Sequence, residues 1–296
     1  MATTKFQAEI LQRLAHLRLD GGQTYVAGGL ALNHQLGTPR ISHDIDIFND
    51  TDEAVVAAFE KDTQCLRAAG YEVLVKREKS FFKEATVSRG GEATDVQWAH
   101  DSAYRFFPLV EDPLLGLTLH PFDLATNKML ALVGRHVPRD LVDAISCHER
   151  LQPLPFLLWA ACGKDPGFSP KFILEFAART HYAQVELDQE VNALGPLDAA
   201  GLSRKWHGMI AAARKTIPLL PPEEAGKCVA NADGTLFRGT DDELRAALGA
   251  GRIVFHEGRI GGAWPRIVTD DVLQKKARPE VRFGLGKGRY SIVDDI

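Results

Sequence analysis

The sequence is short of cysteine, of long apolar runs and of any strong excess of one charge. Its four cysteines are scattered over 296 residues, without a Cys-x-x-Cys pair or a cysteine–histidine spacing typical of zinc. No run approaches the roughly 18 apolar residues that a membrane-spanning helix needs. The first residues, MATTKFQAEILQRLAHLRL, carry charge throughout, unlike a signal peptide. We therefore expect a cytoplasmic protein with free thiols and no membrane partner.

The overall charge balance excludes little else. The formal net charge is −4, so the composition predicts no general attraction to nucleic acid, although a local basic surface is compatible with it. A content of 45% hydrophobic and 25% charged residues is ordinary for a globular chain. At this length a substantial core is expected, in one large domain or in two to three smaller ones.

Periodicity divides the chain into three parts. The first part has helical patterns over 4–18, 30–36 and 52–69, and strand patterns over 25–27, 41–48, 71–75, 86–88 and 94–98, the last two joined at Gly90-Gly91. The second favours helix over 121–135, 139–150, 154–162, 170–179 and 186–213. A proline-rich break at 217–227 precedes one helix, 241–249, and the strand-like runs RIVFHEG and PRIV. We predict an α+β chain with domains at 1–118, 119–216 and 217–296, the last a small α/β region.

Asp44 and Asp46 lie in ISHDIDIF, a run that otherwise reads as a buried strand. Successive side chains of a strand point to opposite faces, so the two aspartates share one face while Ile45 and Ile47 face a core. Two carboxylates this close repel each other unless a cation lies between them. Mg²⁺ is usually held by one or two carboxylates together with substrate phosphates. The pair is therefore a candidate metal site; the simpler alternative is an edge strand with two surface acids.

Small and basic residues precede the aspartates. Gly28 and Gly29 stand where a short strand turns into a helix, and glycine there lets backbone N–H groups approach a phosphate at the helix N-terminus. Arg40 and Ser42 follow just before the acidic strand. Considered alone, Gly28-Gly29 would be only a tight turn, and Arg40 and Ser42 would be ordinary surface residues. Together with the aspartates they predict a phosphate binder, a cation and metal ligands within twenty residues.

The run AGGLALNHQLGTPRISHDIDIF closely resembles the first motif of the polymerase-β-like nucleotidyltransferase superfamily. That motif has Gly-Gly or Gly-Ser, a short helix and then Asp-x-Asp. More narrowly, the run is similar to the AbiEii/AbiGii toxin family. The resemblance covers roughly residues 20–150 and is strongest in 26–48. It implies an N-terminal polymerase-β-like domain with a mixed sheet, followed by a helical domain, and a metal-dependent transfer of NMP from an NTP to an acceptor hydroxyl.

The resemblance also implies a third carboxylate on a neighbouring strand. Asp95, in ATDVQW, is the best candidate, because Val96 and Trp98 would point to the opposite face. Asp101 is weaker, since it follows the strand. Two Mg²⁺ ions, or Mn²⁺, roughly 3.5–4 Å apart would then be held by the carboxylates of Asp44, Asp46 and Asp95.

A second match to the family is DLATNKMLALVGRHVPRDLVDAI, residues 123–145. Lys128 and Arg135 share one helical face, and Asp140 and Asp143 share a face of the next helix. The resemblance implies that Lys128, with Arg40 or Arg135, contacts the triphosphate and that Asp140 orients one of these cations or positions the acceptor. The alternative is two solvated helices joined by salt bridges.

The resemblance further implies the toxin of a bacterial toxin–antitoxin or phage-defence pair, with a cognate antitoxin. By analogy, tRNA is the leading acceptor. An RNA path over the helical half would use a set of basic residues: Arg135, Arg139, Lys205, Arg214 and Lys215. Two alternatives stay open, namely a small-molecule nucleotidyltransferase of the antibiotic-modifying type and a non-catalytic nucleotide-binding module.

Overall fold

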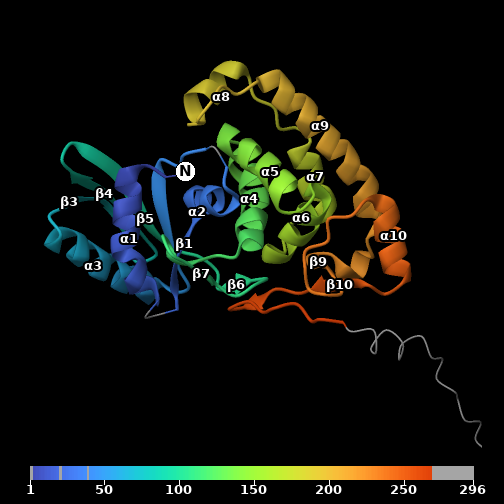
Figure 1. Ribbon diagram of the computed structural model, residues 1–296, viewed down its shortest axis with the longest axis horizontal. Coiled ribbons are helices and arrows are strands. Elements are labelled where there is room, and N and C mark those ends of the chain that lie inside the picture. The colour runs from blue at the N-terminus through green and yellow to red at the C-terminus, as the bar shows by residue number, and fades with distance from the viewer. Residues whose placement is uncertain (1–2, 20–21, 39, 269–296) are drawn as a thin grey trace, which may run out of the picture.

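A seven-stranded sheet and a group of helices make up most of the protein (Figure 1). The computed structural model describes residues 3–19, 22–38 and 40–268. Its strands are β1 (Thr24–Ala27), β2 (Asp44–Asn49), β3 (Glu72–Glu78), β4 (Phe82–Arg89), β5 (Glu92–His100), β6 (Tyr104–Arg105), β7 (Val110–Asp112), β8 (Gly116–Thr118), β9 (Cys228–Asn231), β10 (Ile253–His256) and β11 (Arg259–Ile260). Its helices are α1 (Lys5–Leu19), α2 (Gly28–Leu36), α3 (Asp52–Ala68), α4 (Pro121–Arg135), α5 (Pro138–Arg150), α6 (Leu154–Ala161), α7 (Pro170–Ala177), α8 (Gln184–Glu190), α9 (Ala199–Thr216) and α10 (Asp241–Gly249), with short 3₁₀ helices η1 (Cys162–Lys164), η2 (Ile217–Leu219) and η3 (Pro222–Glu224).

The large sheet is mixed. Its strand order is β3-β4-β5-β2-β1-β8-β7, with β2 parallel to β5 and antiparallel to β1. β4 and β5 form the expected hairpin at Gly90-Gly91, and β3 pairs antiparallel with β4 along the outer edge. The prediction of an α+β fold with a mixed sheet is confirmed.

The two faces of the sheet have different roles. On β2, Ile45 and Ile47 are fully buried, while Asp44 and Asp46 point to the opposite face and are partly exposed. The helices α1 and α3 cover the apolar face, where Trp98 of β5 packs edge-on against Phe59 of α3. The alternation expected from DIDIF is therefore confirmed, and it leaves the aspartates facing away from this core.

Three expectations for local structure were wrong. The helix predicted over 186–213 is broken into α8 and α9, because Gly195-Pro196 interrupts it and proline cannot continue a helical hydrogen-bond ladder. The run PRIV forms no strand in the described part of the chain. The strand predicted from 41 begins only at Asp44, because the preceding segment bonds elsewhere: Ile41 N–H donates to Asn192 O at 2.9 Å.

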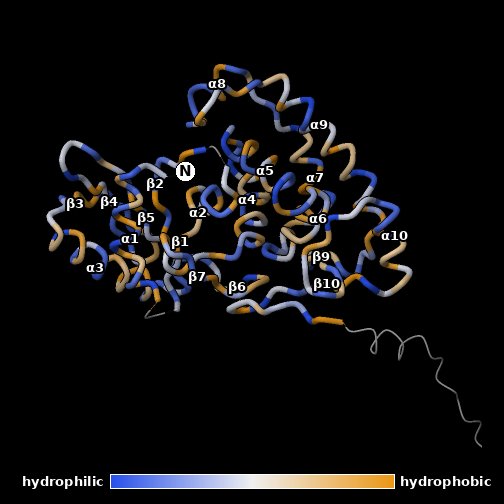
Figure 2. The backbone as a smooth tube through the Cα atoms, in the orientation of Figure 1, coloured by the Kyte–Doolittle hydropathy of each residue, from blue (hydrophilic) through white to orange (hydrophobic). Residues whose placement is uncertain are grey.

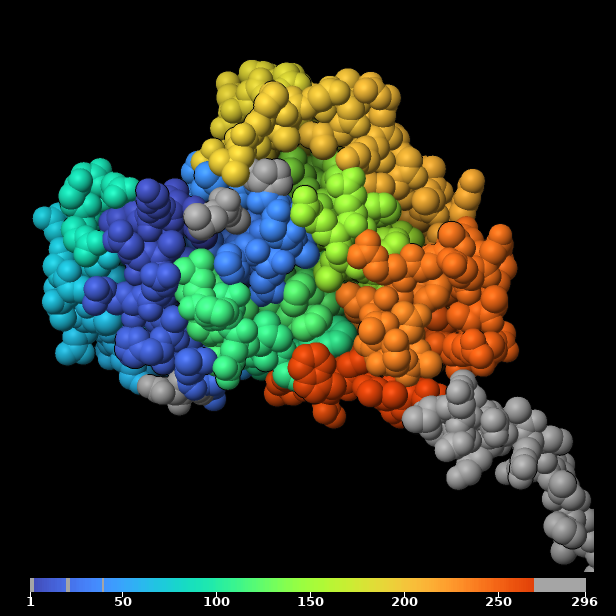
Figure 3. All heavy atoms as spheres, in the orientation of Figure 1, coloured from blue at the N-terminus to red at the C-terminus, as the bar shows by residue number. Residues whose placement is uncertain are grey.

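The helical half follows the sheet, and it is covered by the α8–α9 segment. Figure 3 shows this segment rising above the rest of the molecule. The helix α6, LPFLLWAA, is buried along its whole length and appears hydrophobic in Figure 2. A smaller apolar cluster joins α6 to the last region, through Phe156, Trp159, Leu220, Val229, Phe237 and Leu244. The last region also contacts the first, because β11 pairs with β6. The division into three domains stays a prediction.

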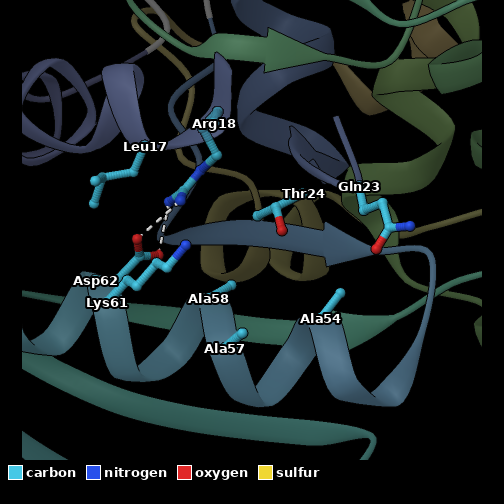
Figure 4. Close-up of a pocket in the computed structure, with 9 residues that line it drawn as sticks. All are labelled: Leu17, Arg18, Gln23, Thr24, Ala54, Ala57, Ala58, Lys61 and Asp62. Atoms are coloured by element: carbon cyan, nitrogen blue, oxygen red, sulfur yellow. Dashed lines mark hydrogen bonds and ion pairs between the residues drawn. The ribbon is translucent and has the colours of Figure 1, made fainter. Parts of the chain in front are cut away.

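A buried ion pair fastens α1 to α3 behind the sheet (Figure 4). The Arg18 guanidinium donates to both carboxylate oxygens of Asp62, at 2.9 and 2.8 Å, and Trp98 Nε1 donates to the same carboxylate at 2.7 Å. Arg18 and Asp62 are 2% and 0% exposed. The pair closes one end of a small hollow of ≈ 220 Å³ between the two helices. It thereby holds the layer that supports β5 and β2.

We expect Asp62→Ala to lower the free energy of unfolding by about 3–5 kcal/mol, because it leaves the Arg18 charge buried without a partner. Urea denaturation measures this. The matched control is Asp242→Ala, at the exposed pair with Arg245, which should cost less than about 1 kcal/mol. Equal losses in the two variants would contradict a structural role for the buried pair.

In the described residues, no helix combines the length and the apolar character needed to cross a membrane.

Candidate functional site

Asp46 lines a cleft of ≈ 340 Å³ between the sheet and α4. The cleft takes its main polar and small residues from three elements: Gly28 and Gly29 of α2, Asp46 of β2, and Lys128 and Arg135 of α4. The sequence therefore predicted side chains that the fold does bring together, although 100 residues of chain separate the first of them from Lys128. Opposite charges face each other across this space.

The two aspartates of β2 influence each other. Burial, with a smaller contribution from the nearby charge of Asp44, raises the pKa of Asp46 to about 6 against the opposing effect of Lys128 and Arg135. Ser42 donates to Asp44 at 3.2 Å. The charged form of Asp46 is therefore disfavoured both by its burial and by its carboxylate neighbour.

The two glycines let the acidic strand and α2 come together. Gly28 adopts φ +67°, and a Cβ atom there would overlap the Asp46 carboxylate. A Cβ on Gly29 would lie 2.5 Å from Arg40 Nη2 and 3.3 Å from Ser42 Oγ. Since α2 begins at Gly28, its first backbone N–H groups lie beside Asp46, at a position that favours anions.

Five charged residues form what we call the ion cluster: Arg40, Lys128, Arg135, Asp140 and Asp143. Lys128 Nζ lies 2.8 Å from Asp140 Oδ1 and 3.1 Å from Asp143 Oδ2. The Arg40 guanidinium binds Asp143 through two hydrogen bonds of 2.7 and 2.8 Å. Arg135 binds Asp140 in the same two-pronged way, at 2.7 and 2.9 Å. Three cations and two carboxylates leave the cluster with one net positive charge.

A tight connection between α4 and α5 sets the geometry of this cluster. Lys128 and Arg135 lie two turns apart on one face of α4. The chain reverses within two residues, with His136 in the left-handed region at φ 49°, and Pro138 starts α5. This reversal places Asp140 beneath both cations of α4.

The cluster keeps its charges despite burial. Burial alone would lower the pKa of Lys128, but Asp143 and Asp140 outweigh it and raise that pKa, so the ammonium stays protonated. Burial alone would raise the pKa of Asp140, but Arg135 and Lys128 hold it below its ordinary value. Lys128 Nζ donates to Asp140 and lies 3.1 Å from Asp143 Oδ2, and Arg135 keeps about half of its side chain exposed. Both can contact an anion in the cleft.

Asp95 is on the right face but has other partners. Its Cα is paired with that of Asp44 in the register of β2 and β5, so both side chains point to the same side. The Asp95 carboxylate accepts hydrogen bonds from Lys76 Nζ and from Thr86 Oγ1, each at 2.7 Å. Partial burial would raise the pKa of Asp95, but these hydrogen bonds hold it below its ordinary value.

Arg40 lies in a setting that differs from the triphosphate contact implied by the resemblance. Arg40 is 3% exposed and committed to Asp143, so it braces the segment before β2 against α5. Asp143 was not singled out as a site residue; its spacing of three from Asp140 was the available signal. Asp101 lies in an adjoining hollow of ≈ 260 Å³ that shares Phe48 with the cleft.

Comparison with known proteins gives likeness in fold. No protein-family model matches the chain, and no curated protein matches it in sequence. Among solved structures, MenT4, a nucleotidyltransferase toxin from Mycobacterium tuberculosis H37Rv, is 16% identical over 70% of this chain and 82% of its own, with a TM-score of 0.49. JHP933 from Helicobacter pylori is 14% identical over 72% of this chain and 90% of its own, with a TM-score of 0.46.

A more distant likeness is to the RNA terminal uridylyl transferase Cid1. It is 11% identical over 93% of this chain and 86% of its own, with a TM-score of 0.29. At such identities the likeness concerns the fold.

We expect the stability of the metal-free protein to fall as the pH rises from about 4 to about 6. The folded state holds the Asp46 proton up to a pKa of about 6, whereas an unfolded aspartate releases it near 3.8, so the folded state binds more protons in this window. Asp46→Asn removes this titration and should be more stable than the wild type at pH 7, on the order of 1 kcal/mol. Denaturation at a series of pH values tests this; a constant difference between the two proteins would contradict it.

Gly28→Ala should destabilise the protein more than Gly70→Ala does. Both glycines have positive φ, but a Cβ on Gly28 meets Asp46 while the space around Gly70 is open within 4 Å. The backbone strain of about 1 kcal/mol is therefore common to both, and overlap adds roughly 1–3 kcal/mol at Gly28 alone. Equal unfolding midpoints in urea would show that Asp46 does not lie against this glycine.

Proposed function

We propose that the protein is a nucleotidyltransferase that moves NMP from an NTP to an acceptor hydroxyl and releases pyrophosphate. The observation that carries this proposal is the cleft in which Asp46 faces Lys128 and Arg135 beside the glycine turn at the start of α2. The side with Asp46 suits a metal ion, and the side with Lys128 and Arg135 suits phosphates. The adjoining hollow offers room for the nucleoside.

Mg²⁺ or Mn²⁺ fits the carboxylate pair. Burial and, to a smaller extent, the charge of Asp44 raise the pKa of Asp46, and a bound cation would offset both effects. In the described residues, no three side chains of His, Cys, Asp or Glu are grouped to hold an ion. We therefore assign Asp44 and Asp46 as ligands, with phosphate oxygens completing the coordination. Asp95 could join them only by releasing Lys76. A bound divalent cation would supply Lewis-acid stabilisation of the polyphosphate and of the attacking oxygen.

The remaining residues bind and orient the nucleotide. Backbone N–H groups at Gly28 and Gly29 cradle the β- and γ-phosphates, with Ser42 behind them. Lys128 and Arg135 stabilise the charge that develops on the leaving pyrophosphate, and Asp140 holds both cations in place. The acceptor oxygen attacks the α-phosphorus, the bond from that phosphorus to the bridging oxygen breaks, and the hydroxyl proton passes to water. Arg40 contributes through Asp143, as a positioning residue.

We further propose an RNA acceptor, tRNA first, and a role as the toxin of a bacterial toxin–antitoxin or phage-defence pair with a cognate antitoxin, acting in the cytoplasm. The support is the similarity of residues 26–48 and 123–145 to the AbiEii/AbiGii family. A small-molecule acceptor is the second candidate. It is favoured by the modest size of the cleft, which needs no nucleic acid to be filled.

Incubation of the protein with each labelled NTP, Mg²⁺ and total cell RNA tests the proposal. Label on an RNA band supports the RNA acceptor. Pyrophosphate released only when a hydroxylated small molecule is added supports the second candidate. Absence of Mg²⁺–NTP binding in a calorimeter would overturn nucleotidyl transfer altogether.

Asp46→Ala should abolish transfer, and Lys128→Ala should lower kcat/KM for the NTP by about 100-fold or more. Lys128→Ala should still fold, because each buried carboxylate retains one ion-pair partner: Asp140 still pairs with Arg135, and Asp143 still pairs with Arg40. Steady-state kinetics with varied NTP measures both effects. The matched control is Lys205→Ala, at an exposed lysine paired with Glu149, which should behave as the wild type. Unchanged NTP kinetics in Lys128→Ala would remove Lys128 from the site.

A further inference from the structure

The face of the sheet that carries the aspartates continues onto β3 and β4. These strands form the left-hand end of the molecule in Figure 1, away from α4–α7. The helix packed against them, α3, lies on the opposite, apolar face. Leu74 of β3 is 68% exposed although it faces the same side as Asp95. This part of the sheet is therefore open to solvent.

A β-bulge places two cations on the open face. The register between β3 and β4 shifts between Val75 and Arg77, so Lys76 is the extra residue. Lys76 reaches Asp95 at 2.7 Å, and Arg77 reaches Glu84 at 3.2 Å. Neighbouring residues of a regular strand would point to opposite faces. The bulge redirects one of them, so both Lys76 and Arg77 lie on the side of the aspartates.

The open face is continuous with the cleft. Gln97 of β5 and Phe82 of β4 line the cleft, and their neighbours Asp95 and Glu84 are the partners of the two basic side chains. Adjacent strands lie about 4.8 Å apart, so β3 is roughly 14 Å from β2. A chain that leaves the catalytic carboxylates along this face reaches the basic edge within a few nucleotides.

The edge carries the chemistry that recognises single-stranded nucleic acid. Besides Lys76 and Arg77 it has Lys79, which makes no ion pair with a described residue and lies 5.8 Å from the ring of Phe81. Phe81 is 52% exposed. The ion pairs of Lys76 and Arg77 are solvent-exposed, and such pairs are weak enough to exchange for phosphate. Cations along a backbone path with an exposed aromatic ring are the elements of sequence-tolerant base stacking.

We propose that this open face, with Leu74, Lys76 and Arg77, and the β3–β4 turn beside it, with Lys79 and Phe81, dock the single-stranded end of an RNA acceptor. The proposal rests on the transfer reaction proposed above and names the surface that presents the acceptor to it. The cations bind phosphates, and Phe81 stacks on a base. The hydroxyl at the end of the strand then lies over Asp44 and Asp46.

Two features disfavour a protein strand as the occupant of this edge and the helical half as the path of the RNA. A protein strand added to β3 would meet the bulge and a run of charged side chains, which are features that protect sheet edges from strand addition. On the helical half, Lys205 and Arg214 of α9 are paired with Glu149 and Glu175. The open face, by contrast, adjoins the carboxylates directly.

The test compares the double variant Arg77→Glu, Lys79→Glu and the single variant Phe81→Ala with the wild type. The matched control is Lys205→Glu, Arg214→Glu on α9. Fluorescence anisotropy with labelled tRNA at several salt concentrations gives affinity and salt dependence, and calorimetry gives Mg²⁺–NTP affinity. The double variant should bind RNA at least about 10-fold more weakly and show a salt slope smaller by about 2, with unchanged NTP affinity. Phe81→Ala should weaken RNA binding by about 10-fold without changing the slope.

The outcomes separate this surface from the proposed function. If the wild type labels RNA and both variants bind RNA as it does, the surface is wrong and the transfer reaction stands. If the wild type binds Mg²⁺–NTP but neither binds nor labels RNA, the RNA acceptor fails and the surface with it. Loss of RNA binding in the α9 control alone would place the acceptor on the helical half. If the double variant unfolds, the single variant Lys79→Glu replaces it. Among the described residues Lys79 has no ion pair, so this substitution breaks none.

Discussion

The salt bridges that join Lys128 to Asp140 and Asp143 are the interaction on which the site depends. They bring a cation from α4 to the cleft without leaving its charge uncompensated. Through Arg40 and Asp143 the same cluster fastens the segment before β2 to α5. The strand β2 and the segment that joins it to α2 are therefore positioned by one buried set of charges. Removal of a buried partner would cost both stability and geometry.

The charges of the ion cluster explain how two aspartates can lie close together on β2 beside the cations of α4. Asp44 and Asp46 add two negative charges beside a cluster with one net positive charge. The cations of α4 lower the pKa of Asp46, but burial and the Asp44 charge outweigh them and raise it to about 6. In the proposed function, the strand binds a cation and the helix α4 binds phosphates. Mg²⁺–NTP satisfies both needs at once.

The two faces of the sheet differ: one packs against α1 and α3, and the other carries the aspartates. On one face, Arg18, Asp62 and Trp98 tie two helices to the strands through buried hydrogen bonds. On the other face, Asp46 lines a cleft, and the same surface extends to an uncovered basic edge. A bulge in β3 contributes to that edge by turning Lys76 and Arg77 to one side. In our proposal, the acceptor approaches along the strands while the nucleotide is held by the helices.

The sequence by itself determined the acidic strand, the glycine turn and the helix of Lys128. These rest on local rules: alternation over DIDIF, the freedom of glycine at positive φ, and helical spacing between Lys128 and Arg135. It also predicted the mixed sheet, through the resemblance of residues 26–48. Only the tertiary structure decided which charges meet. Asp143 pairs with Arg40 across 103 residues, and Asp95 pairs with Lys76 because a bulge changes the register. Such partners depend on strand order and helix packing, which no local pattern encodes.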